Sequence, residues 1–373
     1  MTVTTLRFTA LDTLFFRESR PFDAIGGSEL ASLFPPPPRT VAGAIRTAIG
    51  ESLGADWKAF KKAFDNRAEY MIGGVNLHQR IGFGDDLEQL SIEGIWLSEN
   101  GERLYPAPLF LLRKTDGQTT TFNRLLIGAD ASTSLGRVRL PQLPAGCEGY
   151  KPLEGVWLTR AGLEKVLAGG VPLAGSVPGT GDIREKKRLV AEEPRLGIAR
   201  DNSRRTVETG LLYQTRHVRP IQQVRLVIEA DVTGLDGLSI DKSIVRLGGE
   251  GRMAGIEIAD TPSFPKKPAP DANTHGVIVV LLTPARFGGQ AWLPTGFAPQ
   301  KQGEVQVWKG AINGVSLIVH CAVVGKALRE GGWDLAAPGP RPVQSLIPAG
   351  SSYYCTVDGG GITAAIEALN DKA

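Results

Sequence analysis

The chain has 373 residues, more than one domain usually holds, so we predict two domains. Its formal net charge of +3 is too small to mark the whole chain as a nucleic-acid-binding protein. Cys147, Cys321 and Cys355 lie far apart without a Cys-x-x-Cys spacing, which argues against a structural zinc or a disulfide framework. The N-terminus lacks the pattern of a signal peptide and no apolar run approaches 18 residues, so we expect a soluble, cytoplasmic protein with no membrane partner.

The predicted elements begin with a strand over 4–10, where polar and apolar residues alternate, and a helix over 40–53. Next come a short strand pair, 95–97 and 105–112, and a helix over 158–167. A strand over 226–232 precedes a weak helical stretch, 238–245, and the proline-rich segment 261–273 has the composition of a linker. Strands over 276–283, 315–324 and 351–357 then lead into a short C-terminal helix.

This order of elements predicts the α+β class. Strand, helix, two strands, helix, strand is the order of a ferredoxin-like (βαββαβ, RRM-like) domain, which we place at 1–262 with insertions at about 115–220. A degenerate second ferredoxin-like domain is expected at 272–373. No repeat in the sequence identifies the second domain as a copy of the first.

The start of the first helix is the first candidate site for an anion. Arginines surround the proline run there, and the exposed N–H groups of a helical first turn carry partial positive charge. The candidates are Arg17, Arg20, Arg39, the expected N-cap Thr40, and Arg46. The alternative is a polyproline spacer with solvated arginines.

A glycine-rich loop is the second candidate. Gly248, Gly249 and Gly251 permit positive φ and can turn backbone N–H groups toward an anion, over which Arg252 can close. The spacing fits neither a Walker A loop nor a Rossmann fingerprint. The alternative is a sharp turn before a strand.

A basic hairpin is the third candidate. Residues 184–219 hold ten Lys or Arg and five Asp or Glu, a local charge of +5, which leaves −2 for the rest of the chain. Within this stretch 194–217 predicts a long exposed β-hairpin with Asn202, Arg204 and Arg205 at its tip, suited to reach along a polynucleotide. The alternative is a simple solvated hairpin.

Catalysis has little support in the sequence. The four histidines are scattered outside any HExxH or GxSxG context, so we expect no catalytic residue, no metal site and no cofactor. Asp85 and Asp86, which follow Gly84, are expected to form a turn.

Several segments in the same order resemble the family of the third subunit of the Cmr complex, the RAMP proteins of type III-B CRISPR effectors. They are DTLFFRESRPF, FPPPPRTVAGAIRTAIG, PRLGIARDNSRRTVETGLLYQT, RLGGEGR, TPARF with WLP, GGWD and IPAGSSYY. The resemblance covers nearly the whole chain, apart from about 115–178.

The resemblance implies two ferredoxin-like folds and a non-catalytic subunit that binds the 5′ handle of the guide RNA. It implies as partners the large polymerase-like subunit and the adjacent backbone RAMP subunit. By motif, RLGGEGR would be the RNA-facing loop, and the hairpin from Arg195 to Arg216 the thumb-like element. The alternatives are a guide-processing RAMP endoribonuclease, for which His217 and Tyr213 are the only nearby acid–base candidates, and a structural subunit without RNA contacts.

Overall fold

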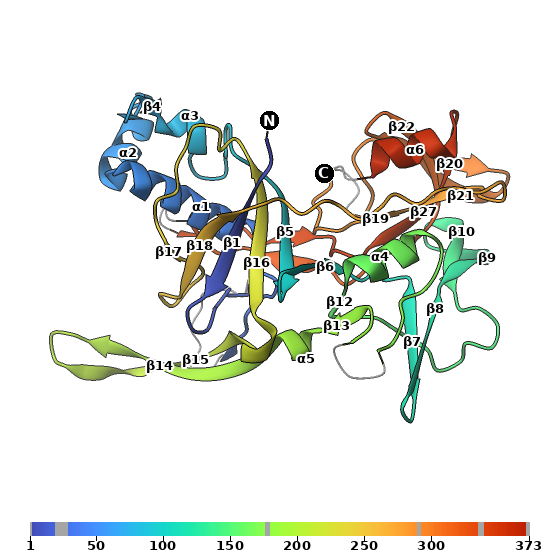
Figure 1. Ribbon diagram of the computed structural model, residues 1–373, viewed down its shortest axis with the longest axis horizontal. Helices are drawn as coiled ribbons and strands as arrows, with labels where there is room; N and C mark the ends of the chain where they lie inside the picture. Colours follow the sequence, from blue (N-terminus) through green and yellow to red (C-terminus); the bar gives the residue numbers. More distant parts are fainter. Residues whose placement is uncertain (1, 19–28, 176–179, 289–291, 335–338, 371–373) are drawn as a thin grey trace. The chain divides into compact units, whose positions relative to one another are not determined.

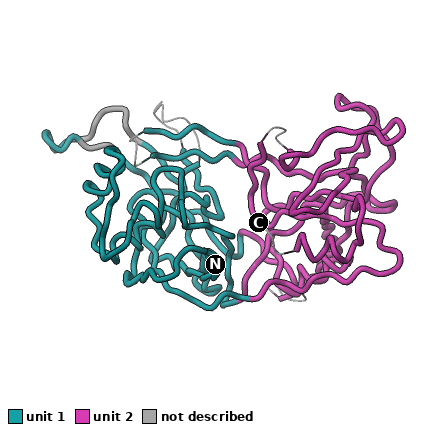
Figure 2. The backbone as a smooth tube through the Cα atoms, turned by 90° about the horizontal axis from the view of Figure 1, so that it is seen from above, with its two compact units in different colours: residues 1–101, 187–262, 329–344 teal, residues 102–186, 263–328, 345–373 magenta. Residues whose placement is uncertain are grey.

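The computed structural model describes residues 2–18, 29–175, 180–288, 292–334 and 339–370. The protein is a mixed α/β chain rich in strands. It divides into two compact units, each built from separated segments (Figure 2). Unit 1 comprises 1–101, 187–262 and 329–344, and unit 2 comprises 102–186, 263–328 and 345–373. No helix among the described residues is long and apolar enough to cross a membrane.

The elements of unit 1 are β1 (Thr4–Ala10), β2 (Glu29–Leu30), α1 (Pro38–Leu53), α2 (Trp57–Asp65), β3 (Met71–Ile72), β4 (Val75–Asn76), α3 (Leu77–Ile81), β5 (Ser91–Glu99), β14 (Val190–Asp201), β15 (Thr206–Pro220), the 3-10 helix η1 (Gln222–Val224), β16 (Leu226–Thr233), β17 (Ile244–Arg246), β18 (Met253–Ala259), β24 (Trp333–Asp334) and β25 (Gly339–Pro340). Three short elements contain residues assigned to both units: α5 (Lys186–Leu189), β23 (Leu328–Glu330) and β26 (Gln344–Leu346).

Unit 1 is organised by an antiparallel sheet whose strands follow the order β5-β16-β1-β18-β17. Helix α1 packs against β5 and β17 through a buried face of Val41, Ala44, Ile45, Ala48 and Ile49, the predicted spacing. The predicted bounds of β1 are confirmed. The expected helix over 238–245 is wrong, because that stretch is an irregular connection followed by β17.

The elements of unit 2 are β6 (Glu102–Pro106), β7 (Leu111–Asp116), β8 (Thr119–Arg124), β9 (Leu126–Thr133), β10 (Gly136–Gln142), β11 (Lys151–Pro152), β12 (Val156–Leu158), α4 (Arg160–Leu167), β13 (Ile183–Glu185), β19 (Val277–Val280), β20 (Ala298–Gln302), β21 (Val305–Ile312), β22 (Val315–Val323), β27 (Ser352–Val357) and α6 (Ile362–Leu369).

Unit 2 contains a five-stranded sheet in the order β19-β27-β22-β21-β20. A buried cluster that includes Leu293, Trp308, Leu317 and Tyr353 packs on it. No helix is formed between β19 and β20 within the described residues, so the structure does not confirm the expected second βαββαβ domain. Residues 102–186, which hold the first part of the insertions expected at about 115–220, group with unit 2.

Candidate nucleic-acid interface

The structure brings together three motifs that lie far apart in the sequence. The segment after β1 runs between strand β15 and the glycine-rich loop. Leu14 exchanges two backbone hydrogen bonds with Val218 of β15, both 2.8 Å long. On the other side Phe15 forms a bridge with Gly248. The N-terminal segment therefore joins the root of the β14–β15 hairpin, where residues 191–195 pair with 215–219, to the loop.

The glycine-rich loop is the turn between β17 and β18. Its first and last residues are tied by a 2.9 Å hydrogen bond from the N–H of Leu247 to the carbonyl of Arg252. Gly248 and Gly251 have φ of +94° and +64°, which explains why glycine stands at both positions. The N–H of Gly249 donates to the carbonyl of Phe15 at 2.8 Å, so it serves the docking of the loop rather than an anion.

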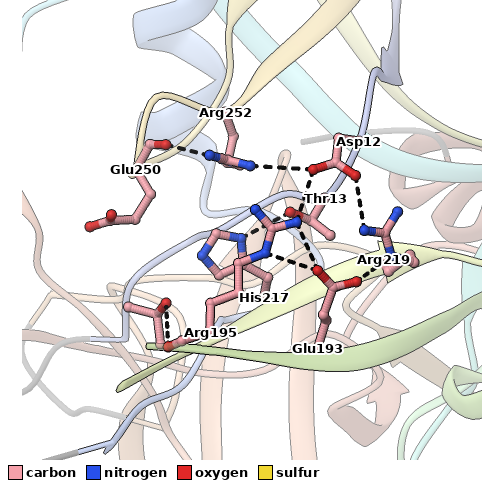
Figure 3. A network of polar contacts seen from close by, with 9 residues as sticks. Asp12, Thr13, Glu193, Arg195, His217, Arg219, Glu250 and Arg252 are labelled. Carbon is pink, nitrogen blue, oxygen red and sulfur yellow. Dashed lines mark hydrogen bonds and ion pairs between the residues drawn. The ribbon is translucent and has the colours of Figure 1, made fainter. Parts of the chain in front are cut away.

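Two carboxylates hold the hairpin root (Figure 3). Asp12 accepts from Arg195 and Arg219, each at 2.9 Å, and from Arg252 at 3.4 Å. Glu193 accepts from the same Arg195 at 2.9 Å and also from Arg219. The network therefore connects the N-terminal segment, both hairpin strands and the glycine loop.

These ion pairs shift the pKa values of both carboxyl groups. The hydrogen bond from Arg195 is the main cause that lowers the pKa of Asp12 to about 2. The hydrogen bonds from Arg219 and then Arg195 lower the pKa of Glu193 to about 2. Both groups are therefore charged in the folded protein at neutral pH.

Arg216 has carboxylate partners of its own. Its Nε and Nη2 donate to the two oxygens of Glu29, both at 2.7 Å, and Nη1 donates to Glu192 at 3.0 Å. This bidentate geometry raises the pKa of Arg216. Together with the Asp12 and Glu193 pairs, it leaves the charge of the hairpin root balanced rather than strongly positive.

His217 lies inside the root and is 2% exposed. Its Nδ1 lies 2.9 Å from the hydroxyl of Thr13, and its ring stacks on Phe15 with centroids 5.0 Å apart. Burial, followed by the charges of Arg195 and Arg252, lowers its pKa. Among the described contacts Tyr213 donates to Glu250 at 3.4 Å rather than to His217.

The tip of the hairpin has a different character from its root. Asp201 accepts backbone N–H bonds from Ser203 at 2.8 Å and Arg204 at 3.1 Å, a local turn that shapes the tip. Asn202, Arg204 and Arg205 are exposed, and the side chain of Arg204 is 82% exposed, 3.8 Å from Asp201. Figure 1 shows β14 and β15 extending away from the sheet of unit 1. The tip therefore presents cations to the surroundings.

The arginines near α1 have protein partners. Arg46 donates to the backbone carbonyls of Ile81, Gly84 and Asp86, and burial lowers its pKa. These contacts occupy donors that a phosphate would need, and they fix the turn that contains Asp85.

Arg39 lies 3.5 Å from Asp85, 3.6 Å from Glu330 and 3.5 Å from Gln344. The expected N-cap Thr40 is wrong, because the helix begins at Pro38 after Pro37, and Thr40 donates its N–H to Pro37 within the first turn. The structure therefore shows no side-chain cap at this helix start.

The remaining two candidates of this group lie before the proline run. Arg17 pairs through its backbone with Ser32, and burial lowers its pKa. Arg20 lies outside the described residues.

The sequence reasoning missed the carboxylates Asp12, Glu29 and Glu193. Asp12 and Arg195 are 183 residues apart. Only the short spacing of Glu193 and Arg195 on one strand gave a local signal, since residues two apart on a strand share a face. Contact between distant charges needs the fold.

A prediction on pH follows from this network. Folded-state pKa values near 2 for Asp12 and Glu193 lie below their ordinary values of 3.8 and 4.5. The stabilisation is present above about pH 5 and is lost as pH falls toward 2. Because both groups are partly exposed, we expect Glu193→Gln to lower the free energy of unfolding at pH 7 by only about 1 kcal/mol.

Urea unfolding of the wild type and Glu193→Gln between pH 7 and pH 3 measures this effect. The difference in the free energy of unfolding between the wild type and Glu193→Gln should shrink as pH falls. Glu69→Gln, at an exposed position of unit 1, is the matched control and should leave the curve unchanged. If Glu193→Gln lowered the free energy of unfolding by the same amount at pH 7 and at pH 3, this result would contradict the charge network.

Residues 6–369 match the family model described as CRISPR-associated protein (Cas_Cmr3). Because the match spans nearly the entire sequence, the chain belongs to the Cas_Cmr3 family of CRISPR-associated proteins and is a Cmr subunit.

The chain is also similar to two solved structures. One is a chain of the cryo-EM structure of the type III-B Cmr-beta bound to cognate target RNA and AMPPnP, state 1. The identity is 16% and the TM-score 0.46, over 94% of this chain and 86% of that chain. The other, from the Cmr-beta bound to cognate target RNA, has 17% identity and a TM-score of 0.44 over the same shares. The curated proteins contain no match.

Proposed function

We propose that this subunit anchors the 5′ handle of the guide RNA, and that the tip of the β14–β15 hairpin makes the main phosphate contacts. The observation that carries the proposal is the contrast between root and tip. The root arginines are held by carboxylates at 2.7 to 2.9 Å, whereas Arg204, 82% exposed and 3.8 Å from Asp201, and Arg205 are exposed at the end of an extended hairpin. Arginine suits this role because its planar fork matches phosphate oxygens.

The root then has a positioning role. Arg195, Arg216 and Arg252 hold the hairpin against the N-terminal segment and the glycine loop through Asp12, Glu29 and Glu193. Because the root is fixed, the tip has less conformational freedom to lose when RNA binds. This preorganisation lowers the entropic cost of binding. Gly248, Gly249 and Gly251 act in the same way, by shaping the loop on which the root rests.

We also propose a ferredoxin-like origin for unit 1. Taking β1, β5, β16 and β18 as its first to fourth strands, their order in the sheet is 4-1-3-2, and α1 follows the first strand. The helix that should follow the third strand is replaced by an irregular connection and β17. This frame leaves the long insertion between β5 and β16 free to carry the hairpin.

The proposed role is non-catalytic, and the proposed protein partners are the large polymerase-like subunit and the adjacent backbone RAMP subunit. The burial of His217 supports the first part, because a side chain that is 2% exposed and stacked on Phe15 has no path to an RNA 2′-hydroxyl. Membership in the family supports the second part.

A gel-shift assay with labelled repeat RNA tests these points together. The isolated chain should bind weakly and lose the RNA as salt rises, because its net charge is only +3. The assembled complex should bind tightly, since other subunits add contacts to the RNA. The RNA should stay intact with wild type and with His217→Ala. Nanomolar binding of a random RNA by the isolated chain would contradict the proposal, and cleavage lost in His217→Ala would favour the endoribonuclease.

A further inference from the structure

The two-stranded ribbon of β9 and β10 in unit 2 has one supported strand and one open strand. β10 packs against β21 and β22, and its Val138, 3% exposed, belongs to the buried cluster of the five-stranded sheet. β9 lies on the outer side of β10 and pairs with it along one edge (Figure 1). Along its other edge β9 has no strand partner among the described residues.

An open edge of this length carries unpaired backbone groups. In an antiparallel pair the hydrogen-bonding groups of alternate residues point toward the partner, and those of the intervening residues point away. β9 is eight residues long, so about half of its residues direct N–H and C=O groups outward. Such a row is a template for another strand.

Another edge strand of unit 2, β20, shows how a protein prevents such pairing. β20 is the last strand of the five-stranded sheet, all five of its residues are exposed, and it contains Pro299 and Lys301. Proline and lysine are the residues that edge strands use against unwanted pairing. β9, with the sequence LIGADAST, contains neither. It begins instead with Leu126 and Ile127, which are 54% and 40% exposed.

Exposed apolar side chains concentrate on this ribbon. Of the nineteen large apolar side chains that are exposed among the described residues, five lie in the eighteen residues 126–143: Leu126, Ile127, Leu135, Leu140 and Leu143. An open hollow of about 640 Å³ lies alongside, lined by Ile127, Gly128, Ala129, Asp130, Arg137 and Arg139. A gathering of this kind on a folded protein marks an interaction site.

We propose that β9 accepts an additional β-strand from a neighbouring protein subunit of the effector. Main-chain hydrogen bonds along the open edge supply the pairing, and Leu126 and Ile127 contact apolar residues of the added strand. The occupant is a strand because the exposed groups are backbone donors and acceptors in a row, and the arginines beside them, Arg137 and Arg139, are paired with Asp130 of β9 itself. The inference uses the membership of the chain in a multisubunit complex, and is independent of the proposed RNA contacts.

Hydrogen exchange of the isolated chain and of the assembled complex tests the proposal. Amides of β9 should exchange at least about tenfold more slowly in the complex, while those of β20 should exchange at the same rate in both. The variant Ile127→Lys with Ala129→Lys should lose the added protection and reduce retention of the subunit in the complex. Ala298→Lys in β20 is the matched control, and thermal unfolding of the isolated chains reports whether the variants fold.

Three results would overturn the proposal. One is equal exchange of β9 in the isolated chain and in the complex. The second is a doubly substituted variant that folds and keeps the added protection. The third is protection of β9 in the isolated chain together with a dimer in sedimentation, which would assign the edge to a second copy of this chain.

Discussion

Gly248→Ala should lower the free energy of unfolding by about 3 kcal/mol. The backbone φ of Gly248 is +94°, a conformation that residues with a side chain rarely adopt. A Cβ added there would lie 2.4 Å from the carbonyl oxygen of Phe15, which is backbone and cannot turn aside. The substitution therefore separates the glycine loop from the N-terminal segment. Urea unfolding at neutral pH measures the loss.

Gly251→Ala is the control for this substitution. Gly251 has a positive φ of +64°, but an added Cβ would meet nothing within 4 Å. We expect a loss of only about 1 kcal/mol, from backbone strain alone. Equal losses at Gly248 and Gly251 would show that docking on Phe15 contributes nothing and that the loop is only a turn.

Replacing Arg204 and Arg205 together by alanine should weaken retention of guide RNA in the assembled complex by about tenfold or more. A plot of the logarithm of affinity against the logarithm of salt concentration has a negative slope, and its magnitude should decrease by about 1 to 2. The reason is that fewer phosphate contacts release fewer counterions on binding. The stability of the chain should stay unchanged, since both side chains are exposed. Filter binding over a salt series measures the first two quantities.

Lys62→Ala with Arg67→Ala is the matched control. It removes the same two charges from exposed positions of unit 1, at the end of α2. If both double variants weaken RNA retention equally, the hairpin tip contributes only general charge and the proposed anchor is wrong.

Sequence periodicity predicted the local elements well. The alternation over 4–10 predicted β1 with its observed bounds, and the apolar spacing from Val41 to Ile49 predicted the buried face of α1. The two β-prone flanks of the polar residues 201–205 likewise predicted the hairpin and its tip. These features depend on residues a few positions apart, whose relation the strand or helix period determines.

Long-range pairing explains what could not be predicted. The sequence gives no signal that Asp12 meets Arg195, 183 positions away, or that 102–186 groups with 263–328. The sequence therefore assigns Arg195, Arg216 and Arg252 to RNA, whereas the fold places carboxylates beside them. Composition distinguishes a basic segment from a neutral one, but only the fold distinguishes a compensated arginine from an exposed one.

The most direct test of the RNA-anchoring role is crosslinking from the guide. A complex assembled with a guide that carries a photoreactive nucleotide in its 5′ handle is irradiated, digested and analysed by mass spectrometry. We predict a crosslink on this chain, in the peptide that contains Asn202, Arg204 and Arg205. A handle that labels only other subunits, while this chain is present in the complex, would contradict the account.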